Sequence, residues 1–302
     1  MIQSPLNYTG GKYKLLPQIL PFFPKKINCF VDLFCGGCNV GINVKANHYI
    51  YNDCCEPLIE LYKIMQNIET ELFIQKINVI IRKYGLSDVK LHGYDYYNCS
   101  SAEGLASYNR EHYFMLRSDF NTFKKRDDVY YIMLYVLIIY AFNNQIRFNQ
   151  KGEFNLPPGK RDFNQKVYNK LVAFLEALHS QQAKFTHVDF RKFDVQSINE
   201  DDFVYVDPPY LITCASYNEQ GGWTENDERD LLNKLDVLSK YKIKFALSNV
   251  LEAKGKENSI LKEWIEARPQ YKMIDLNHSY NNANYQRQGN NKKTREILIL
   301  NY

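Results

Sequence analysis

Several features are scarce in this 302-residue sequence, and each absence narrows the class of protein. The longest apolar run, from Val129 to Phe142, would span only about 21 Å as a helix, which is too short for a bilayer. Residues 1–5 do not have the pattern of a signal peptide. The net charge is only +4, so total charge identifies neither a nucleic-acid-binding nor a membrane-binding protein. We therefore expect a globular protein that does not enter a membrane.

A regular disulfide spacing is also absent. The number of cysteines is odd, and we expect a reducing, cytoplasmic environment. Cys35 and Cys38 have the spacing of a zinc or redox motif, but no second pair completes it, so we expect no metal site. The seven cysteines are Cys29, Cys35, Cys38, Cys54, Cys55, Cys99 and Cys214.

The most informative stretch covers residues 203–210. Phe203 to Val206 reads as a short buried strand, which Pro208 and Pro209 end because proline has no backbone N–H. Asp207 is therefore placed at the carboxyl end of a strand, where open α/β sheets bind ligands, with Tyr210 close by. The alternative is an Asp-Pro-Pro turn with a packed tyrosine.

Two glycine-rich stretches lie nearer the N-terminus. Gly10 and Gly11 precede a helix predicted from Tyr13 to Phe23, and this pattern alone favours a simple turn with a solvated Lys12. Residues 28–41 read as a strand, a glycine-rich turn and the start of a helix, which is typical of the first binding turn of a doubly wound sheet. The glycines match neither the dinucleotide fingerprint nor a P-loop.

Acidic residues follow three of the predicted strands. Asp32 could hold a cationic amino group, and Asp53 lies about 20 residues after the glycine turn, where a ribose-binding acid is expected. Asp189 and Phe190 could bind an adenine-type ring, although a structural turn is nearly as well supported. Further strands are predicted at 244–249, 273–276 and 296–300. The alternation of strands and helices predicts an α/β fold.

The region 58–161 is mostly helical and is predicted to be inserted into a catalytic domain made of residues 1–57 and 162–302. Its last part, residues 143–159, is rich in Asn, Gln and Arg, the side chains that read purine edges. A hairpin around Lys151 is plausible there, and a polar surface loop is the alternative. The candidate DNA-binding residues in it are Asn144, Arg147, Asn149, Lys151 and Pro157.

A second basic, Asn-rich stretch lies between residues 277 and 295 and suits contact with phosphates. A solvated loop is the alternative. Its candidate residues are Arg287, Lys292, Lys293 and Arg295.

Three stretches in this order, at residues 7–12, 32–37 and 207–210, resemble the D12 class of adenine-N6 DNA methyltransferases, the class of the Dam-type enzymes. The stretches 147–157 and 294–298 support the resemblance, which covers nearly the whole chain. Asn7 stands where many GATC-specific members have a lysine, so the resemblance leaves the target sequence open.

The resemblance implies a doubly wound, Rossmann-like methyltransferase sheet with S-adenosylmethionine as methyl donor and double-stranded DNA as partner. It implies that the insertion is a target-recognition domain, with Arg147 near a guanine. It also implies a restriction-modification or DNA-marking role, with a cognate restriction endonuclease as a potential partner. The cofactor-binding residues would be Tyr8, Gly10, Gly11, Lys12, Asp32, Phe34, Gly36, Asp53, Asp189, Phe190 and Asp207, and the catalytic ones Asp207, Pro208, Pro209 and Tyr210.

In the reaction that this family performs, Asp207 and the Pro208 carbonyl would accept hydrogen bonds from the adenine N6 amine. The base would be flipped out of the duplex and stacked on Tyr210. Two alternatives stay open: an adenine-N6 methyltransferase acting on RNA, and a non-catalytic DNA-binding protein with a degenerate methyltransferase fold. Enzymes that methylate cytosine N4 or glutamine usually carry Ser or Asn in place of Asp207.

Overall fold

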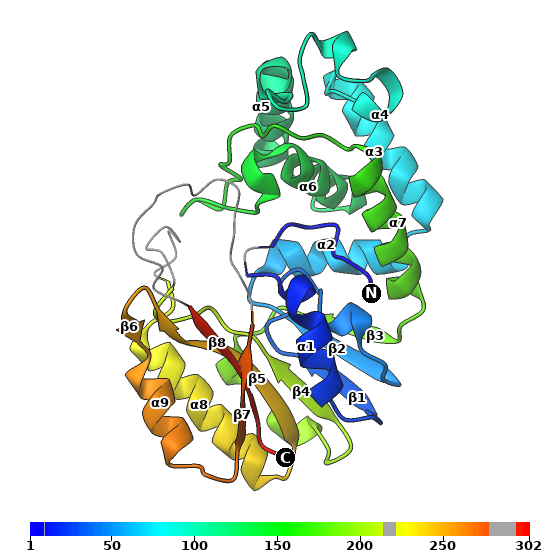
Figure 1. The fold of residues 1–302 in the computed structure, drawn as a ribbon. Helices are drawn as coiled ribbons and strands as arrows, with labels where there is room; N and C mark the ends of the chain where they lie inside the picture. The colour runs from blue at the N-terminus through cyan, green and yellow to red at the C-terminus, as the bar shows by residue number, and fades with distance from the viewer. Residues whose placement is uncertain (9, 214–221, 278–293) are drawn as a thin grey trace. The chain divides into compact units, whose positions relative to one another are not determined.

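A computed structural model describes residues 1–8, 10–213, 222–277 and 294–302 (Figure 1). The chain forms two compact units. Unit 1 contains residues 1–11, 36–43 and 55–185, and unit 2 contains residues 12–35, 44–54 and 186–302. Three of the candidate DNA-binding residues, Arg287, Lys292 and Lys293, lie outside the described residues. None of the described helices is long and apolar enough to cross a membrane.

A mixed sheet of parallel and antiparallel strands, together with helices, confirms the predicted α/β fold. The strand order is β3-β2-β1-β4-β5-β8-β7, with a short β6 beside β5. β1 lies parallel to β2 and β4, and β4 lies parallel to β5, whereas β8 is antiparallel to β5 and β7. The strands are β1 Cys29–Asp32, β2 His48–Asn52, β3 Ala183–Thr186, β4 Phe203–Val206, β5 Lys244–Ala253, β6 Lys256–Glu257, β7 Lys272–Leu276 and β8 Arg295–Leu300.

The strand order reverses at β1, because β2 lies on one side of it and β4 on the other. In an open α/β sheet this reversal opens a crevice at the carboxyl ends of the two central strands. Asp32 is the last residue of β1, and Asp207 follows the last residue of β4. The topology therefore brings both predicted acids to the edge where ligands bind.

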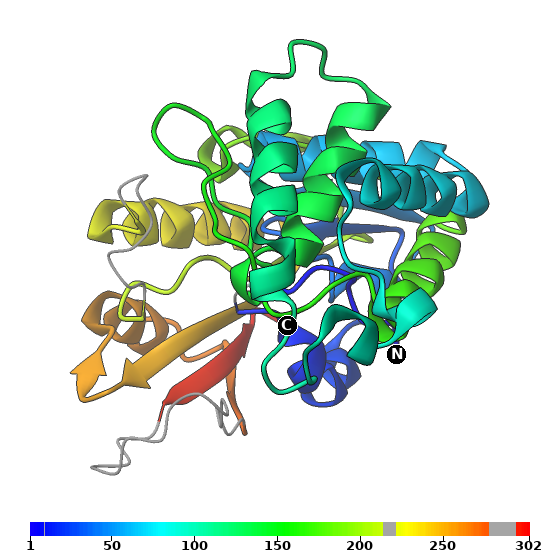
Figure 2. The ribbon, with the colours of Figure 1, turned by 90° about the horizontal axis from the view of Figure 1, so that it is seen from above.

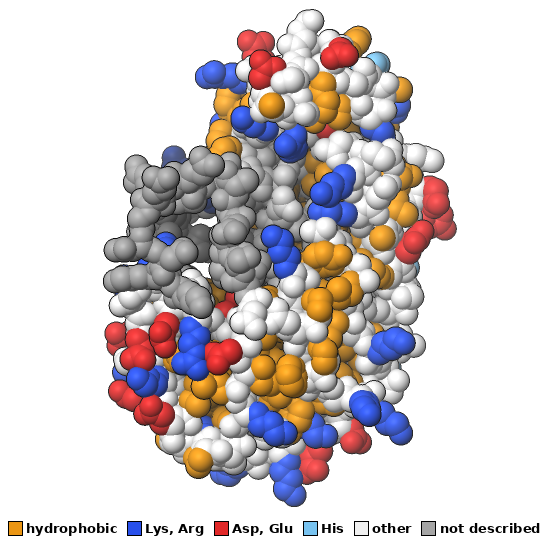
Figure 3. Space-filling model, viewed as in Figure 1, with side chains coloured by type: hydrophobic (Ala, Val, Ile, Leu, Met, Phe, Trp, Pro, Cys, Tyr) orange, Lys and Arg blue, Asp and Glu red, His pale blue; other side chains and the backbone are white. Residues whose placement is uncertain are grey.

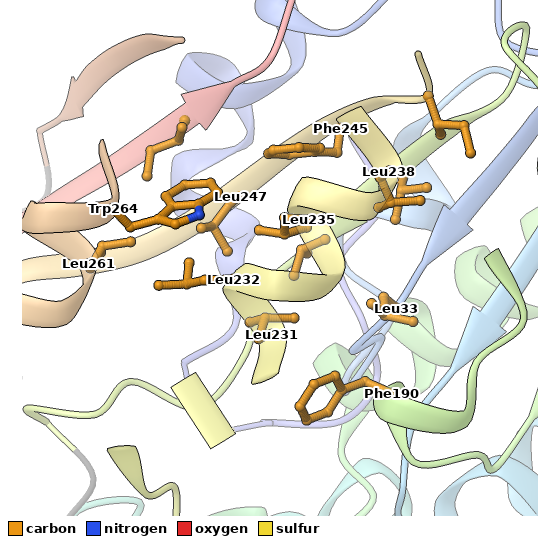
Figure 4. Close-up of a cluster of buried hydrophobic side chains, with 14 of the residues drawn as sticks. Leu33, Phe190, Leu231, Leu232, Leu235, Leu238, Phe245, Leu247, Leu261 and Trp264 are labelled. Atoms are coloured by element: carbon orange, nitrogen blue, oxygen red, sulfur yellow. The ribbon is translucent and has the colours of Figure 1, made fainter. Parts of the chain in front are cut away.

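Alternation of side chains along β4 gives unit 2 its two packed faces. Val204 and Val206 join a core made with α8 (Glu225–Lys240), α9 (Ser259–Glu266) and β5, which Figure 4 shows around Leu231 and Leu235. On the opposite face, Phe203 contacts Phe23 with ring centroids 4.7 Å apart. Each fully buried leucine or valine contributes about 1.5–3 kcal/mol, so β4 is fixed from both sides.

The N-terminal helix predicted from Tyr13 to Phe23 is broken into three short pieces. They are a 3₁₀ turn at Lys12–Leu15, α1 at Leu16–Ile19 and a second 3₁₀ turn at Leu20–Phe22. Pro17 and Pro21 each stand near the start of a new piece, because proline cannot donate the hydrogen bond that would continue a helix.

Unit 1 is built from helices, and α5 and α6 lie side by side in it (Figure 2). The apolar run of the sequence forms α6, which is buried from Tyr130 to Tyr140 and packs against α2, α3 and α5. The predicted insertion 58–161 lies wholly within this unit, which has wider bounds. The helices are α2 Glu56–Asn67, α3 Thr70–Tyr84, α4 Val89–His92, α5 Ala106–Thr122, α6 Asp128–Tyr140 and α7 Gln165–His179.

The glycine-rich turn after β1 is not followed by the predicted helix, and that prediction was wrong. Residues 41–43 form a single 3₁₀ turn instead. The Asn43 side chain exchanges hydrogen bonds with the backbone of Ile2, at 2.7 Å in each direction, and Asn39 accepts one from the Ser4 amide. Asparagine side chains that bond to distant backbone groups compete with helix formation.

Candidate active site

Four side chains of unit 2 meet where β4 ends. Lys12 Nζ lies 2.9 Å from Asp207 Oδ1 and 3.4 Å from Glu296 Oε1. The Tyr210 hydroxyl lies 2.9 Å from Asp207 Oδ1 and 3.2 Å from Glu296 Oε1, so its single proton can be donated to either carboxylate, and it accepts a hydrogen bond from Lys12. The Lys12 ammonium also lies 4.9 Å from the centre of the Tyr210 ring. We call Lys12, Asp207, Tyr210 and Glu296 the acid–lysine cluster.

The cluster is largely withdrawn from water. The side chains of Lys12 and Glu296 are 3% and 2% exposed, and that of Asp207 is 17% exposed. Burial raises the pKa of Asp207 above its ordinary value of 3.8, and the charge of Glu296 raises it further, while Lys12 and Tyr210 oppose the increase. The more accessible member of the two acids is thus the one that follows β4.

The sequence analysis named three members of this cluster as site residues: Lys12, Asp207 and Tyr210. The solvated Lys12 favoured by the glycine turn alone was wrong, since this lysine is buried against Asp207. Glu296 was not among the predicted site residues. The available signal was a glutamate directly before the apolar run 297–300 of β8, where a buried charge needs a partner. Pro208 is buried, whereas Pro209 is exposed.

A second polar group lies at the ends of β1 and β2. Asp32 and Asp53 are both buried, at 2% and 7% exposure. Asn52, which the sequence did not single out, holds the turns around them. Its side-chain amide donates to the carbonyls of Leu33 and Val188, at 3.1 and 2.9 Å, and its oxygen accepts from the Val188 amide. The loop that carries Asp189 is thereby tied to the turn that carries Phe34.

Three aromatic rings pack together beside these acids. Phe34 and Phe190 have ring centroids 5.5 Å apart, and the Trp223 indole lies 5.8 Å from the first and 5.5 Å from the second. The indole donates a 2.6 Å hydrogen bond to Glu228, which is fully buried and also accepts from Asn249 and Asn258. Burial raises the pKa of Glu228. Trp223 and its anchor were also missed by the sequence analysis.

Asp189 is exposed and takes part in an arginine clamp. Its carboxylate accepts from the amide of Arg191 at 2.8 Å and lies 3.2 Å from the Arg191 guanidinium. The same guanidinium pairs with Asp227 and Asp230 at the start of α8. The hydrogen bonds to Asp230 and Asp227 raise the pKa of Arg191, and the charge of Asp189 adds to the increase.

In unit 1, the two glycine-rich turns of the sequence pack against each other. A side chain at Gly36, whose φ is +44°, would approach the Tyr8 ring to 2.8 Å. The Gly36 carbonyl accepts a hydrogen bond from Tyr62, and the Gly11 amide donates to the Tyr8 carbonyl. Gly10 has a φ of +80°, a conformation that favours glycine. The cofactor candidates Tyr8, Gly11 and Gly36 therefore belong to one packed arrangement.

The predicted hairpin around Lys151 is present as a turn bridged by Phe148 and Phe154. The Asn149 side chain caps this turn by accepting from the amides of Lys151 and Glu153, at 2.9 and 3.0 Å. The exposed Arg147 guanidinium donates to Asn155 Oδ1 at 2.7 Å.

Three more candidate DNA-binding residues within the described ranges also have structural partners. Asn144 donates to the Ile139 carbonyl, and the Pro157 carbonyl accepts from the Phe142 amide. Arg295 pairs with Asp275 at 2.7 Å and with Glu252 at 3.6 Å. On the face shown in Figure 3, Lys and Arg side chains are scattered rather than gathered in one patch.

Among the described residues, no group of three or more His, Cys, Asp or Glu side chains is arranged to hold a metal ion. The six cysteines in the described ranges are free thiols.

Comparison with known proteins identifies one family. The model of the D12 class N6 adenine-specific DNA methyltransferases matches residues 8–282. The chain is 41% identical to the modification methylase StsI of Streptococcus sanguinis and to the type II methyltransferase M.FokI of Planomicrobium okeanokoites. Both alignments cover all of this chain but only 43% of the relative, so the chain spans less than half their length. It is 25% identical to the DNA adenine methylase of Escherichia coli K12, over 98% of this chain and 94% of that one.

Proposed function

This chain belongs to the D12 class of N6 adenine-specific DNA methyltransferases, and we propose that it transfers a methyl group from S-adenosylmethionine to adenine N6 in a short duplex DNA motif. The observation that carries the proposal is the position of Asp207. It follows a central strand at the point where the sheet order reverses, and Lys12 and Tyr210 hold it in a largely buried site. A carboxylate fixed in this way can accept hydrogen bonds from an amine.

The chemistry assigned to Asp207 and Pro208 follows from the properties of the adenine amine. The N6 lone pair is delocalised into the ring, so the amine is a weak nucleophile. The Asp207 carboxylate and the Pro208 carbonyl would each accept a hydrogen bond from one N6 hydrogen, which localises the lone pair on nitrogen. The same groups stabilise the positive charge that develops on N6 during transfer. S-adenosylmethionine supplies a methyl group already activated by its sulfonium.

The residues at the ends of β1 and β2 fit this cofactor. We assign the buried Asp32 to its amino group, Asp53 to its ribose hydroxyls, and the rings of Phe34 and Phe190 to its adenine. Tyr8, Gly10, Gly11 and Gly36 of unit 1 stay candidate cofactor-binding residues on the family resemblance alone. Lys12 is assigned instead to the acid–lysine cluster, because it contacts both of its carboxylates.

Trp223 is a further candidate for the adenine end, since its indole packs on both Phe34 and Phe190. The chain has two tryptophans, so Trp264→Phe leaves Trp223 as the only indole fluorophore. We expect S-adenosylmethionine to change the fluorescence of that variant, and Trp223→Ala to weaken cofactor binding about tenfold, as loss of a stacking ring does. Unchanged affinity in Trp223→Ala, measured by calorimetry, would remove Trp223 from the site.

The target adenine cannot be reached inside a duplex, so we propose that it is flipped out. Residues 58–161 are assigned to target recognition because they carry the exposed Arg147 on the capped turn around Lys151. Tyr210 would stack on the flipped base, offsetting about 1–3 kcal/mol of lost stacking. In the structure its hydroxyl is bound within the acid–lysine cluster.

We expect Arg147→Ala to weaken binding to the preferred motif by about 1–3 kcal/mol and to relax the choice of base at one position. Arg147→Lys keeps the charge but loses the planar fork, so it should retain the salt dependence of binding and still lose the base preference. Binding to a library of duplexes that differ at single positions measures both effects. An unchanged base preference in Arg147→Ala would overturn the assignment.

We also infer a restriction-modification context, because two relatives are named modification methylase and type II methyltransferase. A cognate endonuclease of the same specificity would then be a functional partner. Genomic DNA from cells expressing the protein should resist that endonuclease.

The function is tested by sequencing genomic DNA from a methylation-free host with a method that detects modified bases. We expect N6-methyladenine in one short motif only when the protein is expressed. Methylation of cytosine would overturn the assignment to adenine. A lack of new DNA methylation, with methylated adenine in cellular RNA, would favour the RNA alternative, and bound cofactor without any transfer would favour a binding protein.

A further inference from the structure

The acid–lysine cluster contains more acid than the proposed reaction requires. One lysine serves two carboxylates, Asp207 after β4 and Glu296 in β8, and the Tyr210 hydroxyl bridges the same two groups. Glu296 is the more buried acid, at 2% side-chain exposure against 17% for Asp207. A buried carboxylate is costly unless it is paired, so its presence calls for an explanation.

Lys12 poses a problem for an acceptor role of Asp207. The distance of 2.9 Å between Lys12 Nζ and Asp207 Oδ1 is that of a charge-assisted hydrogen bond. A carboxylate fully committed to such a pair is a weaker acceptor for the amine of a substrate. A second carboxylate, that of Glu296, lies 3.4 Å from the same ammonium and shares its electrostatic attraction with Asp207. The formal charge of the group, two acids and one lysine, is then −1.

We propose that Glu296 is a positioning residue for methyl transfer: it draws Lys12 and the Tyr210 hydroxyl toward β8 and so leaves Asp207 a strong acceptor for the adenine amine. The inference rests on the proposed function. Glu296 is fixed in place because its strand pairs with β5 on one side and β7 on the other. The antiparallel strand β8 thereby supplies the Glu296 carboxylate, which affects Asp207 at the end of the parallel strand β4.

The proposal predicts a specific response to Glu296→Gln, which keeps the shape of the side chain and removes its charge. Lys12 would then pair with Asp207 alone. We expect kcat to fall about ten- to a hundredfold, while the affinities for S-adenosylmethionine and for the DNA duplex stay within about twofold.

The pH dependence of kcat separates this effect from simple structural damage. The charge of Glu296 raises the pKa of Asp207, so its removal should move the acid limb of the kcat profile to lower pH even as the plateau falls. Damage to the site would lower the plateau without that displacement. The charged or titratable groups that influence this region are Lys12, Asp32, Tyr205, Tyr210 and Glu296, and only the last is altered.

Glu252→Gln is the matched control, because Glu252 is an exposed acid of β5 that pairs with Arg295 next to Glu296. It should leave kcat and the pH profile unchanged. Glu296→Asp keeps the charge but lengthens its 3.4 Å contact with Lys12, so its kcat should lie between those of the wild type and Glu296→Gln. If Glu296→Gln does not fold, a lowered kcat with unchanged cofactor affinity in Glu296→Asp supports the proposal.

Wild-type kcat and an unmoved acid limb in a folded Glu296→Gln variant would overturn the proposal. If Glu296→Gln does not fold, a wild-type kcat in Glu296→Asp would overturn the proposal. Failure of the inference is distinguishable from failure of the proposed function, since in the second case the wild-type protein itself transfers no methyl group to DNA.

Discussion

Asp207→Ala is expected to lower the rate of methyl transfer at least about 10²–10³-fold while leaving cofactor and DNA binding in place, because it removes an acceptor that acts most strongly in the transition state. The fold should survive this change. Lys12 lies 3.4 Å from Glu296, so neither of the remaining buried charges is left without a partner. Asp207→Asn should be intermediate, since its amide oxygen can still accept one hydrogen bond but carries no charge.

Single-turnover transfer to a duplex, at saturating S-adenosylmethionine, measures the chemical step directly. Glu200→Ala is the control, because Glu200 is an exposed acid shortly before β4 and should not affect the rate. The pKa of Asp207 is raised, so the wild-type rate should fall as the pH drops through a value above 3.8. An Asp207→Ala variant that turns over at the wild-type rate would exclude this residue from the mechanism.

The parts of this site that the sequence revealed are those encoded by neighbouring residues. A buried run that stops at Asp207 before two prolines specifies a strand end within a few positions, and the observed β4 has those bounds. The capping box formed by Thr224 and Asp227 at the start of α8 is likewise encoded by neighbouring residues. Local signals of this kind do not depend on the rest of the fold.

The parts that the sequence missed depend on contacts between distant segments. The role of Lys12 is set by Asp207 and Glu296, which reach it from two strands far along the chain. Lys12 follows a glycine turn and begins a short 3₁₀ helix, and neither local pattern predicts that its side chain is buried. The Glu296 carboxylate is brought to Lys12 only when β8 pairs between β5 and β7.

The helix predicted after the glycine-rich turn that follows β1 failed for the same reason. The sequence there satisfies the local pattern, but Asn43 finds hydrogen-bond partners in the backbone of Ile2, which no window around the turn contains. Trp223 was overlooked because its anchor, Glu228, is a buried glutamate in a helix whose other first-turn acids are exposed or partly exposed. For the failed helix, a long-range polar contact outweighed local propensity.

Lys12→Met should be the most destabilising single change in the acid–lysine cluster. It removes the ammonium that both carboxylates contact and leaves Asp207 and Glu296 buried close to each other. Removal of one partner from a buried charge group typically costs about 3–5 kcal/mol. For a chain of this length we expect the melting temperature to fall by roughly 10 °C. Lys14→Met is the matched control, because Lys14 is exposed two residues away and its loss should change stability little.

The stability deficit of Lys12→Met should depend on pH in a defined direction. Lys12 lowers the pKa of Asp207, so its loss raises that pKa further above the unfolded value. A group with a raised pKa in the folded state gains stability on protonation. The difference in unfolding free energy between wild type and variant should therefore be largest near neutral pH and shrink as the pH falls through the raised pKa. A deficit that is independent of pH would show that lost packing, and not charge, is responsible.

Adding Glu296→Gln to Lys12→Met tests whether the cluster acts as a charge balance. The double variant retains one buried carboxylate in place of two that repel each other, so it should be more stable than Lys12→Met alone. In the wild-type background, Glu296→Gln removes a partner of Lys12 and should destabilise. The same substitution is thus expected to change the sign of its effect with the background, which independent sites do not show. Equal destabilisation in both backgrounds would mean that Lys12 and Glu296 contribute separately, and the shared-ammonium argument for Glu296 would lose its physical basis.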